Sequence, residues 1–386
     1  MTVFPLFCGK EEKMQEKIRF CVPCLLGVEG LAAEELRDMG CEEVAAENGR
    51  VLFSGNEAIL ARANLNCRYS ERVMILLGEF PAASFEELFQ GVKALPWEEY
   101  LRQDDEFPVT GSSLSSQLHS VPDCQSIVKK AVVERLKEKY HLSWFPETGA
   151  LHRIRFRILK DKVSILLDTS GAGLHKRGYR RESTEAPMKE TLAAALVKLA
   201  RVRTDGNFLD PFCGSGTLLI EAALLATHTA PGLHRRFNAE TWQDADKAVW
   251  KAERERAAAQ IRTDATFHAT GFDLDPAAVS LTLENAKKAG VGKYVQARQQ
   301  DVRDFTCADR YGCVVCNPPY GERLLDVRSA RELYKVMGQV FLRQPGWSYG
   351  VITPDEEFEA LFGRKADKRR KLYNGMIKCQ FYQYFK

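Results

Sequence analysis

Residues 314–320, with the sequence VVCNPPY, combine the end of a buried strand with groups suited to chemistry. The first three are apolar and predict a strand end, and Pro318 and Pro319 stop helix or sheet from continuing. The side chain of Asn317 and the carbonyl of Pro318 can each accept one N–H of an exocyclic amino group. Tyr320 can stack on the ring that carries this group. We therefore interpret these last four residues as catalytic, although Asn-Pro alone is common in turns.

A glycine-rich turn follows another short strand, residues 207–209, and precedes a helix expected over residues 218–226. Glycines let a ligand approach the backbone, and the N–H groups of a helix N-terminus favour an anionic group. Leu219 replaces the third glycine of the dinucleotide fingerprint, and no lysine follows the last glycine, so neither NAD nor a phosphate loop is favoured. The residues predicted to bind a cofactor here are Asp210, Pro211, Phe212, Cys213, Gly214, Ser215, Gly216 and Thr217.

Acidic residues follow the next two expected strands, residues 269–275 and 294–298. Asp273 at the tip of the first can accept both hydroxyls of a ribose, whereas Asp275 precedes Pro276 in the position of a helix N-cap. Asp301 after the second can accept from an adenine amino group, although such an aspartate is more often a cap. The residues predicted to bind the cofactor therefore also include Asp273, Leu274, Asp301, Val302 and Asn317. The long gap before these strands is interpreted as an insertion, residues 228–262, with a charged helix, Trp242 and Trp250.

Length and composition indicate a multidomain globular protein. Its 386 residues allow two or three domains, and no run of 18 apolar residues or secretory signal is present, so we expect a cytoplasmic protein without a membrane span. The 11 cysteines are scattered and odd in number, which fits reduced thiols. The CxxC pairs Cys21/Cys24 and Cys313/Cys316 lie in apolar stretches, so we expect buried cysteines and no metal. We expect residues 1–16 to be a flexible tail, with Met14 as an alternative start.

The periodicity of the chain predicts an α/β organisation in three parts. Residues 17–78 alternate strand, helix, strand, helix and strand, which predicts a ferredoxin-like domain. Residues 79–171 form a second α/β unit, with helices over 85–93 and 125–140, a strand over 108–110 and a hairpin over 152–168. From residue 186 onward, helices alternate with fully apolar strands, as in a doubly wound parallel sheet.

The net charge of +3 conceals a strong asymmetry. Residues 17–100 carry 8 Lys/Arg against 14 Asp/Glu, residues 151–186 carry 9 against 4, and residues 363–386 carry 8 against 1. Such concentrated cations, interleaved with aromatic rings, predict contacts with a polyanion, although a charged run is often only a solvated surface. The residues predicted to bind RNA are three that share one strand face, Arg153, Arg155 and Arg157; a linker, His175, Lys176, Arg177, Tyr179, Arg180 and Arg181; and a loop, Arg364, Lys365, Lys368, Arg369, Arg370 and Lys371.

The order of these motifs carries a resemblance to a known family. The chain resembles the class I S-adenosylmethionine-dependent methyltransferases in the order of its glycine turn, Asp273, Asp301 and Asn-Pro-Pro-Tyr. The branch of that family that methylates amino groups uses the same tetrapeptide. Residues 167–171, 174–181 and 186–191 (LDTSG, LHKRGYRR and APMKET) are similar to the THUMP-domain RNA methyltransferases, most closely to bacterial 23S rRNA guanine-N2 methyltransferases. The similarity extends over residues 17–386.

The resemblance implies S-adenosylmethionine as cofactor, RNA as partner and guanine N2 as target atom. It implies that residues 79–171 are a THUMP RNA-binding domain. Residues 172–386 would form a Rossmann-like methyltransferase domain with a mixed, mainly parallel seven-stranded sheet, which begins with a basic linker and first helix over 172–190. Some relatives carry a second methyltransferase domain that makes 7-methylguanine; the sequence stops at Lys386, so we do not expect that activity. We expect a monomer.

Three alternative functions stay open. A tRNA guanine-N2 methyltransferase would share every motif. An adenine-N6 methyltransferase would also use Asn-Pro-Pro-Tyr, but it would not need the two N-terminal domains. A non-catalytic RNA-binding assembly factor with a relic fold would be expected to lose part of the set Asp210, Asp273 and Asn317, all of which are present.

Overall fold

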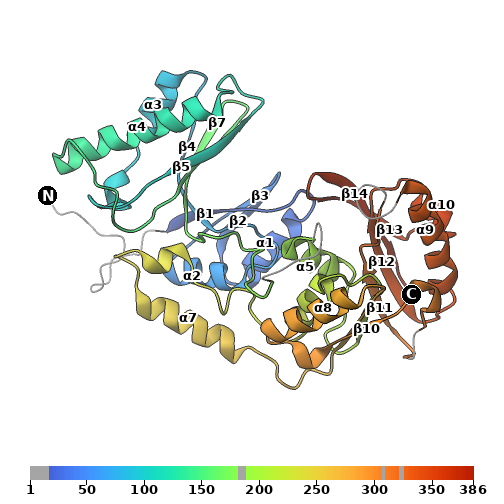
Figure 1. The fold of residues 1–386 in the computed structure, drawn as a ribbon. Coiled ribbons are helices and arrows are strands. Elements are labelled where there is room, and N and C mark those ends of the chain that lie inside the picture. The colour runs from blue at the N-terminus through green and yellow to red at the C-terminus, as the bar shows by residue number, and fades with distance from the viewer. Residues whose placement is uncertain (1–16, 181–187, 307–308, 321–325) are drawn as a thin grey trace.

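The computed structural model describes residues 17–180, 188–306, 309–320 and 326–386, and these form two seven-stranded sheets with helices packed against them (Figure 1). The predicted tail over residues 1–16 and Arg181 lie outside the described residues. Among the described helices, none combines the length and the apolar composition that a membrane span requires.

The N-terminal unit has the ferredoxin-like fold. Its elements are β1 (Ile18–Pro23), α1 (Glu29–Asp38), β2 (Glu42–Glu47), β3 (Arg50–Gly55), α2 (Glu57–Asn66) and β4 (Met74–Pro81). The strands pair in the order β2-β3-β1-β4, and every pair is antiparallel. The sequence pattern missed β2. This strand lies at the edge of the sheet with almost every side chain exposed, so it lacks the alternation of apolar residues that reveals a strand.

The second unit continues the same sheet. Strand β7 pairs antiparallel with β4, from Met74 opposite Asp168 to Pro81 opposite Lys162, which gives the order β2-β3-β1-β4-β7-β6-β5. Backbone strand pairing, with one register shift between Leu76 and Gly78, therefore joins the two units that the sequence predicts as separate domains. The elements are α3 (Phe85–Lys93), η1 (Trp97–Glu99), β5 (Val109–Leu114), α4 (Val121–Tyr140), β6 (Ile154–Leu159) and β7 (Lys162–Asp168).

The C-terminal part contains the second sheet, in the order β10-β9-β8-β11-β12-β14-β13. Neighbouring strands from β10 to β12 are parallel, and β14 runs antiparallel between β12 and β13, which confirms the predicted mixed, mainly parallel sheet. The strand order reverses between β8 and β11, and ligands of such sheets bind at the carboxyl ends of the strands at this reversal. The strands are β8 (Asn207–Asp210), β9 (His268–Asp273), β10 (Val295–Gln299), β11 (Gly312–Cys316), β12 (Trp347–Thr353), β13 (Lys368–Asn374) and β14 (Ile377–Tyr384).

Helices connect these strands and cover the sheet (Figure 1). They are α5 (Glu190–Leu199), α6 (Thr217–Ala226), η2 (Asn238–Thr241), α7 (Lys247–Ala259), α8 (Pro276–Lys288), η3 (Gly292–Tyr294), η4 (Val302–Asp304), α9 (Val327–Phe341) and α10 (Phe358–Phe362). Helix α6 follows directly from the glycine turn after β8. Nearly all of its residues are buried, as expected for a helix that is apolar on every side.

The basic segment at residues 364–371 is not a loop, as the sequence analysis predicted. Its second half belongs to β13, which pairs with β14 over seven residues. Basic side chains on an outer strand keep other strands from pairing with it, and the buried Leu372 anchors β13 to the core. Lys368, Arg369, Arg370 and Lys371 therefore lie on the hairpin of β13 and β14, whereas Arg364 and Lys365 precede it.

The insertion attaches the C-terminal part to both N-terminal units. Helix α7 lies beside α2 (Figure 1), and Arg62 donates two hydrogen bonds to Glu253, at 2.9 and 2.7 Å. Trp242 is buried and stacks on His152 of the second unit, with ring centroids 4.5 Å apart. The structure thus gives a packing role to a segment that the sequence identified only as an insertion.

We expect the Arg62–Glu253 contact to stabilise the fold. Both side chains are largely shielded, with 18% and 10% exposure, and the two hydrogen bonds are charge-assisted. A double-mutant cycle with Arg62→Ala and Glu253→Ala should give a coupling energy of about 1–3 kcal/mol in urea unfolding.

The matched control is the ion pair Lys251–Glu255 on the same helix, whose side chains are 79% and 68% exposed. Its cycle should give a coupling energy close to zero. Equal coupling in the two cycles would contradict the proposed role of α7.

Candidate active site

The glycine turn joins β8 to α6 at the carboxyl edge of the sheet. Gly216 has φ +81°, and a Cβ on it would lie 2.9 Å from Cγ2 of Thr282, so both the backbone conformation and the packing require glycine. The N–H of Gly214 donates to Oδ2 of Asp273 at 2.9 Å. The end of β9 therefore holds the turn at the end of β8.

Two polar residues of α8 donate hydrogen bonds to backbone carbonyls of this turn. Oγ1 of Thr282 donates to the carbonyl of Gly214 at 2.9 Å, and Nδ2 of Asn285 donates to the carbonyl of Ser215 at 3.0 Å. Both side chains are fully buried. The sequence analysis missed them, although two polar residues three positions apart on the buried face of an amphipathic helix were a usable signal.

Asp210 is buried at the start of the turn, where its Oδ1 accepts the N–H of Phe212 at 3.1 Å. Burial raises the pKa of Asp210 to about 8, and the charge of Asp273 adds to the rise. A carboxyl in such a place can take a neutral form, and a cationic ligand group beside it would favour the ionised form. The site is therefore suited to a positively charged ligand.

Asp273 and Asp275 differ in role, as the sequence predicts. Oδ1 of Asp273 accepts the N–H of Asp275 and its Oδ2 accepts that of Gly214, so the carboxylate stands at the junction of two strands. Asp275 caps α8 by accepting from Ala277 at 2.8 Å, which confirms its predicted cap position. Leu274 between them is 63% exposed and offers an apolar surface at the sheet edge. Binding of a ribose by Asp273 stays a prediction.

Asp301 caps the short helix η4. One of its oxygens accepts the N–H of Arg303 and the other pairs with the Arg303 guanidinium at 2.7 Å, and Val302 is buried beside it. The capping role that the sequence left open is thus present. The adenine contact of Asp301 remains a prediction.

Asn317 stands directly after β11, on the other side of the strand-order reversal. Its Oδ1 is buried and has no hydrogen-bond partner among the described residues. Buried acceptors in folded proteins are nearly always paired. Six other buried side-chain atoms of the described residues also lack a partner, so the place of Asn317 at a strand end beside the reversal, together with its unpaired oxygen, favours a ligand donor there. Tyr320 follows, and its hydroxyl accepts a hydrogen bond of 2.7 Å from Nδ2 of Asn374. Sequence analysis missed Asn374, because it lies 54 positions further along the chain than Tyr320.

Arg155 and Arg157 share one face of β6, as predicted, Arg153 directly precedes the strand, and the three differ in their surroundings. Ile154, Phe156 and Ile158 fill the opposite, buried face. Arg153 is exposed, Arg155 pairs with the buried Asp168 at 3.0 Å, and Arg157 is half-buried, where burial and the nearby Arg50 lower its pKa. Contact of these arginines with RNA stays a prediction.

The linker requires a correction, because Arg177 and Tyr179 are buried. The Arg177 guanidinium pairs with Glu221 of α6 at 3.3 Å and donates to the carbonyls of Leu174 and Arg68. The Tyr179 hydroxyl donates to Glu221 at 3.3 Å, and burial raises its pKa well above the ordinary value. These residues hold the ferredoxin-like unit against α6, so they do not contact RNA as predicted.

The remaining predicted cations lie at the surface or pair with acids. Four of them pair or bond within the protein: His175 with Glu71, Arg180 with Glu190, Arg364 with Asp367, and Arg369 with Glu359. Arg370 donates to the carbonyl of Gly27 at 2.8 Å. Exposed positions are occupied by Lys176, Lys365, Lys368 and Lys371.

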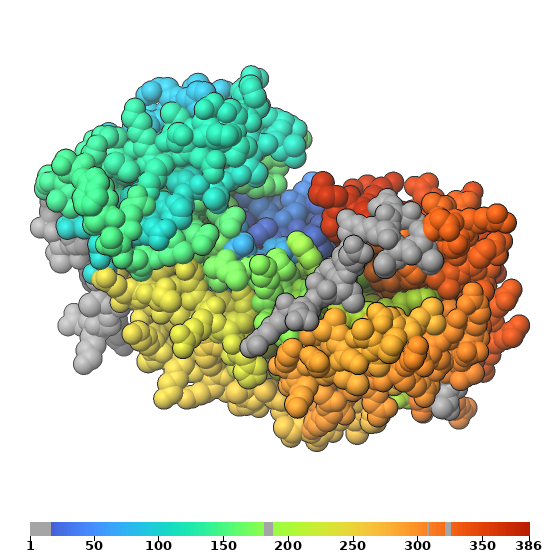
Figure 2. Space-filling model, viewed as in Figure 1, coloured from blue at the N-terminus to red at the C-terminus, as the bar shows by residue number. Residues whose placement is uncertain are grey.

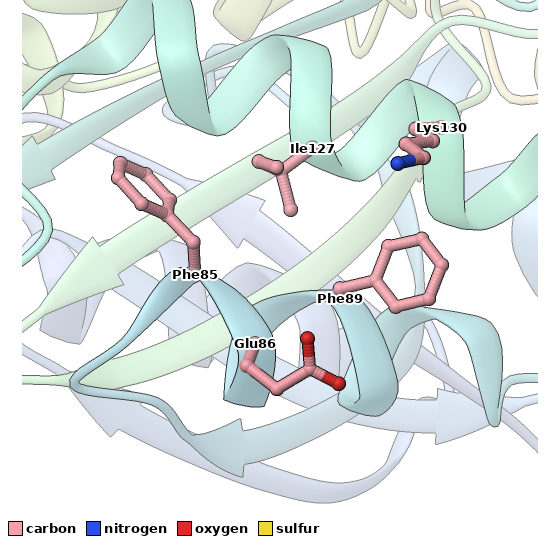
Figure 3. A pocket seen from close by; sticks show the side chains of 5 residues that line it. All are labelled: Phe85, Glu86, Phe89, Ile127 and Lys130. Carbon is pink, nitrogen blue, oxygen red and sulfur yellow. The ribbon is translucent and has the colours of Figure 1, made fainter.

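A small cavity elsewhere does not involve the predicted site. It has a volume of about 160 Å³ and lies between α3 and α4, where the rings of Phe85 and Phe89 and the side chain of Ile127 face it (Figure 3). Glu86 and Lys130 complete its rim. In the described part of the chain, no group of three His, Cys, Asp or Glu side chains is placed to hold a metal ion.

Three segments of the chain match known domain families. The chain matches the RlmL ferredoxin-like domain over residues 19–74, the THUMP domain over 82–168 and the RMKL-like methyltransferase domain over 177–383. A protein of Bacillus subtilis (strain 168), described as "Putative RNA methyltransferase YpsC", is 44% identical over 362 residues, which cover 93% of this chain and 94% of that protein.

Two solved structures have the same fold over nearly the whole chain. One is SMU.472, described as a "putative methyltransferase complexed with SAH"; it is 42% identical, has a TM-score of 0.91 and covers 96% of this chain and 99% of its own. The other, a "predicted N6-adenine-specific DNA methylase" from Listeria monocytogenes strain 4b F2365, is 47% identical with a TM-score of 0.91, and 96% of each chain is covered.

S-adenosylmethionine is accordingly the cofactor, and the residues around the reversal fit it. The buried carboxyl of Asp210 suits a molecule with a sulfonium and an ammonium group. Leu274 is exposed at the same edge, and contact of Leu274 with the adenine and of Asp273 with the ribose remains a prediction.

We expect Asp273→Ala to weaken S-adenosylmethionine binding by more than about tenfold in titration calorimetry, because a charge-assisted acceptor and a support of the glycine turn are both lost. Asp273→Asn keeps one acceptor oxygen and should lose less. Asp275→Ala is the control: it removes a helix cap and should lower stability by about 0.5–2 kcal/mol while affinity stays near that of the wild type. A larger loss of affinity for Asp275→Ala would transfer the ribose role to that residue.

We further expect Arg177→Met to lower the free energy of unfolding by about 3–5 kcal/mol, since Glu221 would remain buried without its partner. Lys176→Met, at the exposed neighbouring position, should change it by no more than about 0.5 kcal/mol. Denaturant unfolding measures both. If Arg177→Met kept full stability and instead weakened RNA binding, the original interpretation of the linker would be restored.

Proposed function

The chain belongs to the RMKL-like methyltransferases that carry an RlmL ferredoxin-like domain and a THUMP domain, and from this premise we propose that it methylates the exocyclic N2 of a guanine in RNA. The main expected substrate is 23S rRNA, and tRNA is the alternative. We assign residues 17–78 to the ferredoxin-like domain, 79–171 to the THUMP domain and 172–386 to the methyltransferase domain.

The observation that carries the proposal is the buried Oδ1 of Asn317, which has no hydrogen-bond partner in the part of the chain that the structure describes. It stands across the strand-order reversal from the glycine turn, at the carboxyl edge of the same sheet. An amino group that approached the cofactor there would donate one N–H to Asn317 and the other to the carbonyl of Pro318. A guanine N2 or an adenine N6 offers such a pair of N–H donors on a flat ring.

The chemistry requires orientation more than proton transfer. Bound S-adenosylmethionine supplies an electrophilic methyl group. The lone pair of guanine N2 is delocalised into the ring, and the two acceptors favour a pyramidal nitrogen whose lone pair points at that methyl. The N2–carbon bond forms while the sulfur–carbon bond breaks, the electron pair of that bond remains on sulfur, and N2 then releases a proton to water. Positioning of this kind can contribute about 7–11 kcal/mol, so Asn317 need not act as a base.

A hollow on one face of the molecule supports RNA as the substrate. Figure 2 shows it between the THUMP domain and the C-terminal hairpin, with the ferredoxin-like domain at its floor. The exposed cations Arg153, Lys176, Lys365, Lys368 and Lys371 can contact phosphates, which contribute most of non-specific affinity. The target base must leave its stack at a cost of a few kcal/mol, and stacking on Tyr320 would offset part of it.

Adenine N6 is the second candidate target. The description of the Listeria relative favours it, and the acceptors at Asn317 and Pro318 would serve an adenine equally well. The two N-terminal domains favour an RNA substrate over duplex DNA, since the THUMP-domain family that the chain resembles acts on RNA.

The test is to incubate the protein with labelled S-adenosylmethionine and separately purified, unmodified rRNA and tRNA, and to identify the product nucleoside by mass spectrometry. N2-methylguanosine in rRNA supports the proposal in full. The same nucleoside in tRNA alone would change the substrate, and N6-methyladenosine would overturn the assignment of the target atom.

We expect Asn317→Ala to abolish methylation while the affinities for cofactor and RNA stay within about threefold of the wild type. The carboxamide fixes the attacking nitrogen, and a displacement of about 1 Å can cost on the order of 100-fold in rate. Single-turnover rates and binding titrations separate the two effects.

Asn317→Asp sharpens the interpretation of this result. It keeps the shape and adds a stronger acceptor, but it places a negative charge near the sulfonium. Partial activity would show that hydrogen-bond acceptance suffices, and none would show that charge balance matters. Wild-type rates for Asn317→Ala would refute the mechanism.

A further inference from the structure

Every second side chain of β13 lies on one face of the strand, and this face contacts two other parts of the protein. Side chains alternate along a strand, so Arg370, Leu372 and Asn374 point to the same side. Asn374, the last residue of the strand, donates its Nδ2 hydrogen bond of 2.7 Å to the hydroxyl of Tyr320. Because β13 runs parallel to β11 and β12, this end lies at the same sheet edge as the catalytic tetrapeptide.

The ferredoxin-like domain holds the other part of the same face. Nη1 of Arg370 donates to the carbonyl of Gly27 at 2.8 Å. Gly27 has φ +92°, and a Cβ there would lie 2.9 Å from the carbonyl oxygen of Lys371 and 3.2 Å from Cδ2 of Leu372. The loop between β1 and α1 thus touches β13 so closely that only glycine fits.

This contact matters because β13 is the outermost strand of its sheet. Among the described strands it pairs only with β14, so no neighbour on its free edge fixes its position. The contact with Gly27 supplies that restraint over two successive residues. The position of Asn374 then depends on the N-terminal domain, far away in the sequence.

We propose that Asn374 is a positioning residue, which holds the Tyr320 ring at the angle at which the target base stacks on it, and that the ferredoxin-like domain sets its place through Gly27. This inference rests on the proposed function, since stacking of the target guanine on Tyr320 is part of it. The ferredoxin-like domain thereby serves the chemical step as well as any contact with RNA.

The physical argument lies in the freedom of a tyrosine side chain. Its ring turns about two bonds, and the hydrogen bond from Asn374 to the hydroxyl restrains the far end of the ring. Loss of this bond allows the ring to tilt, and a base stacked on it tilts too, so the amino group leaves its attack geometry. The rate of the chemical step should therefore fall, whereas S-adenosylmethionine affinity should not.

The experiment is a double-mutant cycle in single-turnover methylation of an unmodified 23S rRNA transcript. Asn374→Ala and Tyr320→Phe should each lower the rate about 3- to 10-fold, as expected for one hydrogen bond, and the double variant should be no slower than either single variant. Asn374→Asp should recover much of the rate, because a carboxylate can accept from the tyrosine hydroxyl.

Lys378→Ala is the matched control. Lys378 lies on the same hairpin, opposite Tyr373, and its exposed side chain should leave the rate unchanged. Calorimetry with S-adenosylmethionine should give wild-type affinity for all variants. The proposal is overturned if Asn374→Ala keeps the wild-type rate, or if its effect is the same with and without the Tyr320 hydroxyl.

A second pair of variants tests the restraint by the ferredoxin-like domain. Gly27→Ala would force a methyl group against β13 and should lower the rate of methylation to the level of Asn374→Ala without changing cofactor affinity. Gly30→Ala, three residues away, has nothing within 4 Å of the added methyl and should behave as the wild type. Equal rates for these two variants would refute the restraint.

Failure of this inference can be told apart from failure of the proposed function. If the wild-type protein forms no N2-methylguanosine, the proposed function fails. If it forms N2-methylguanosine and the Asn374 variants match the wild type, only the positioning role fails. Thermal melts of each variant exclude loss of folding as the cause.

Discussion

An amide oxygen at the end of β11, buried and without a hydrogen-bond partner among the described residues, is the constraint on which the rest of the account depends. Leaving such an acceptor unpaired costs about 1–3 kcal/mol, and a fold retains it only where surrounding contacts hold it in place. Here two prolines fix the backbone after Asn317, β11 lies buried between β8 and β12, and Asn374 holds Tyr320. The glycine turn follows β8, the strand next to β11, so one sheet edge carries both the residues proposed to orient the nucleophile and the residues proposed to bind the methyl donor.

The N-terminal half is joined to this edge by contacts too extensive for a flexible tether. The pairing of β4 with β7 makes a single sheet of the ferredoxin-like and THUMP domains. The buried pair Arg177–Glu221, the Arg62–Glu253 contact and the stacking of Trp242 on His152 then fix this sheet against the methyltransferase domain. Such an arrangement suits the proposed function, because the distance between the proposed RNA-binding surface and residues 317–320 is then set by the protein.

Local patterns were sufficient to predict the catalytic domain from the sequence, and long-range contacts were not. Apolar strands alternating with helices predicted a parallel sheet, the resemblance carried by the glycine turn, Asp273, Asp301 and Asn-Pro-Pro-Tyr implied the mixed, mainly parallel sheet that is observed, and the cap role of Asp275 followed from Pro276. Strand β2 was not predicted, because an exposed edge strand lacks an alternating apolar pattern. Strand β13 was predicted as a loop, because its first four residues are basic and show no strand pattern. The burial of Arg177 depends on Glu221, 44 positions away, which no local window contains.

The most direct measurement of the central claim uses RNA in which the target amino group is removed chemically. A 23S rRNA transcript made with inosine in place of guanosine lacks every exocyclic N2, whereas one made with 7-deazaguanosine keeps N2 and changes only the ring. We expect methyl transfer from labelled S-adenosylmethionine to the 7-deazaguanosine transcript and none to the inosine transcript. Transfer to the inosine transcript at the rate seen with guanosine would contradict the assignment of guanine N2 as the atom that Asn317 orients.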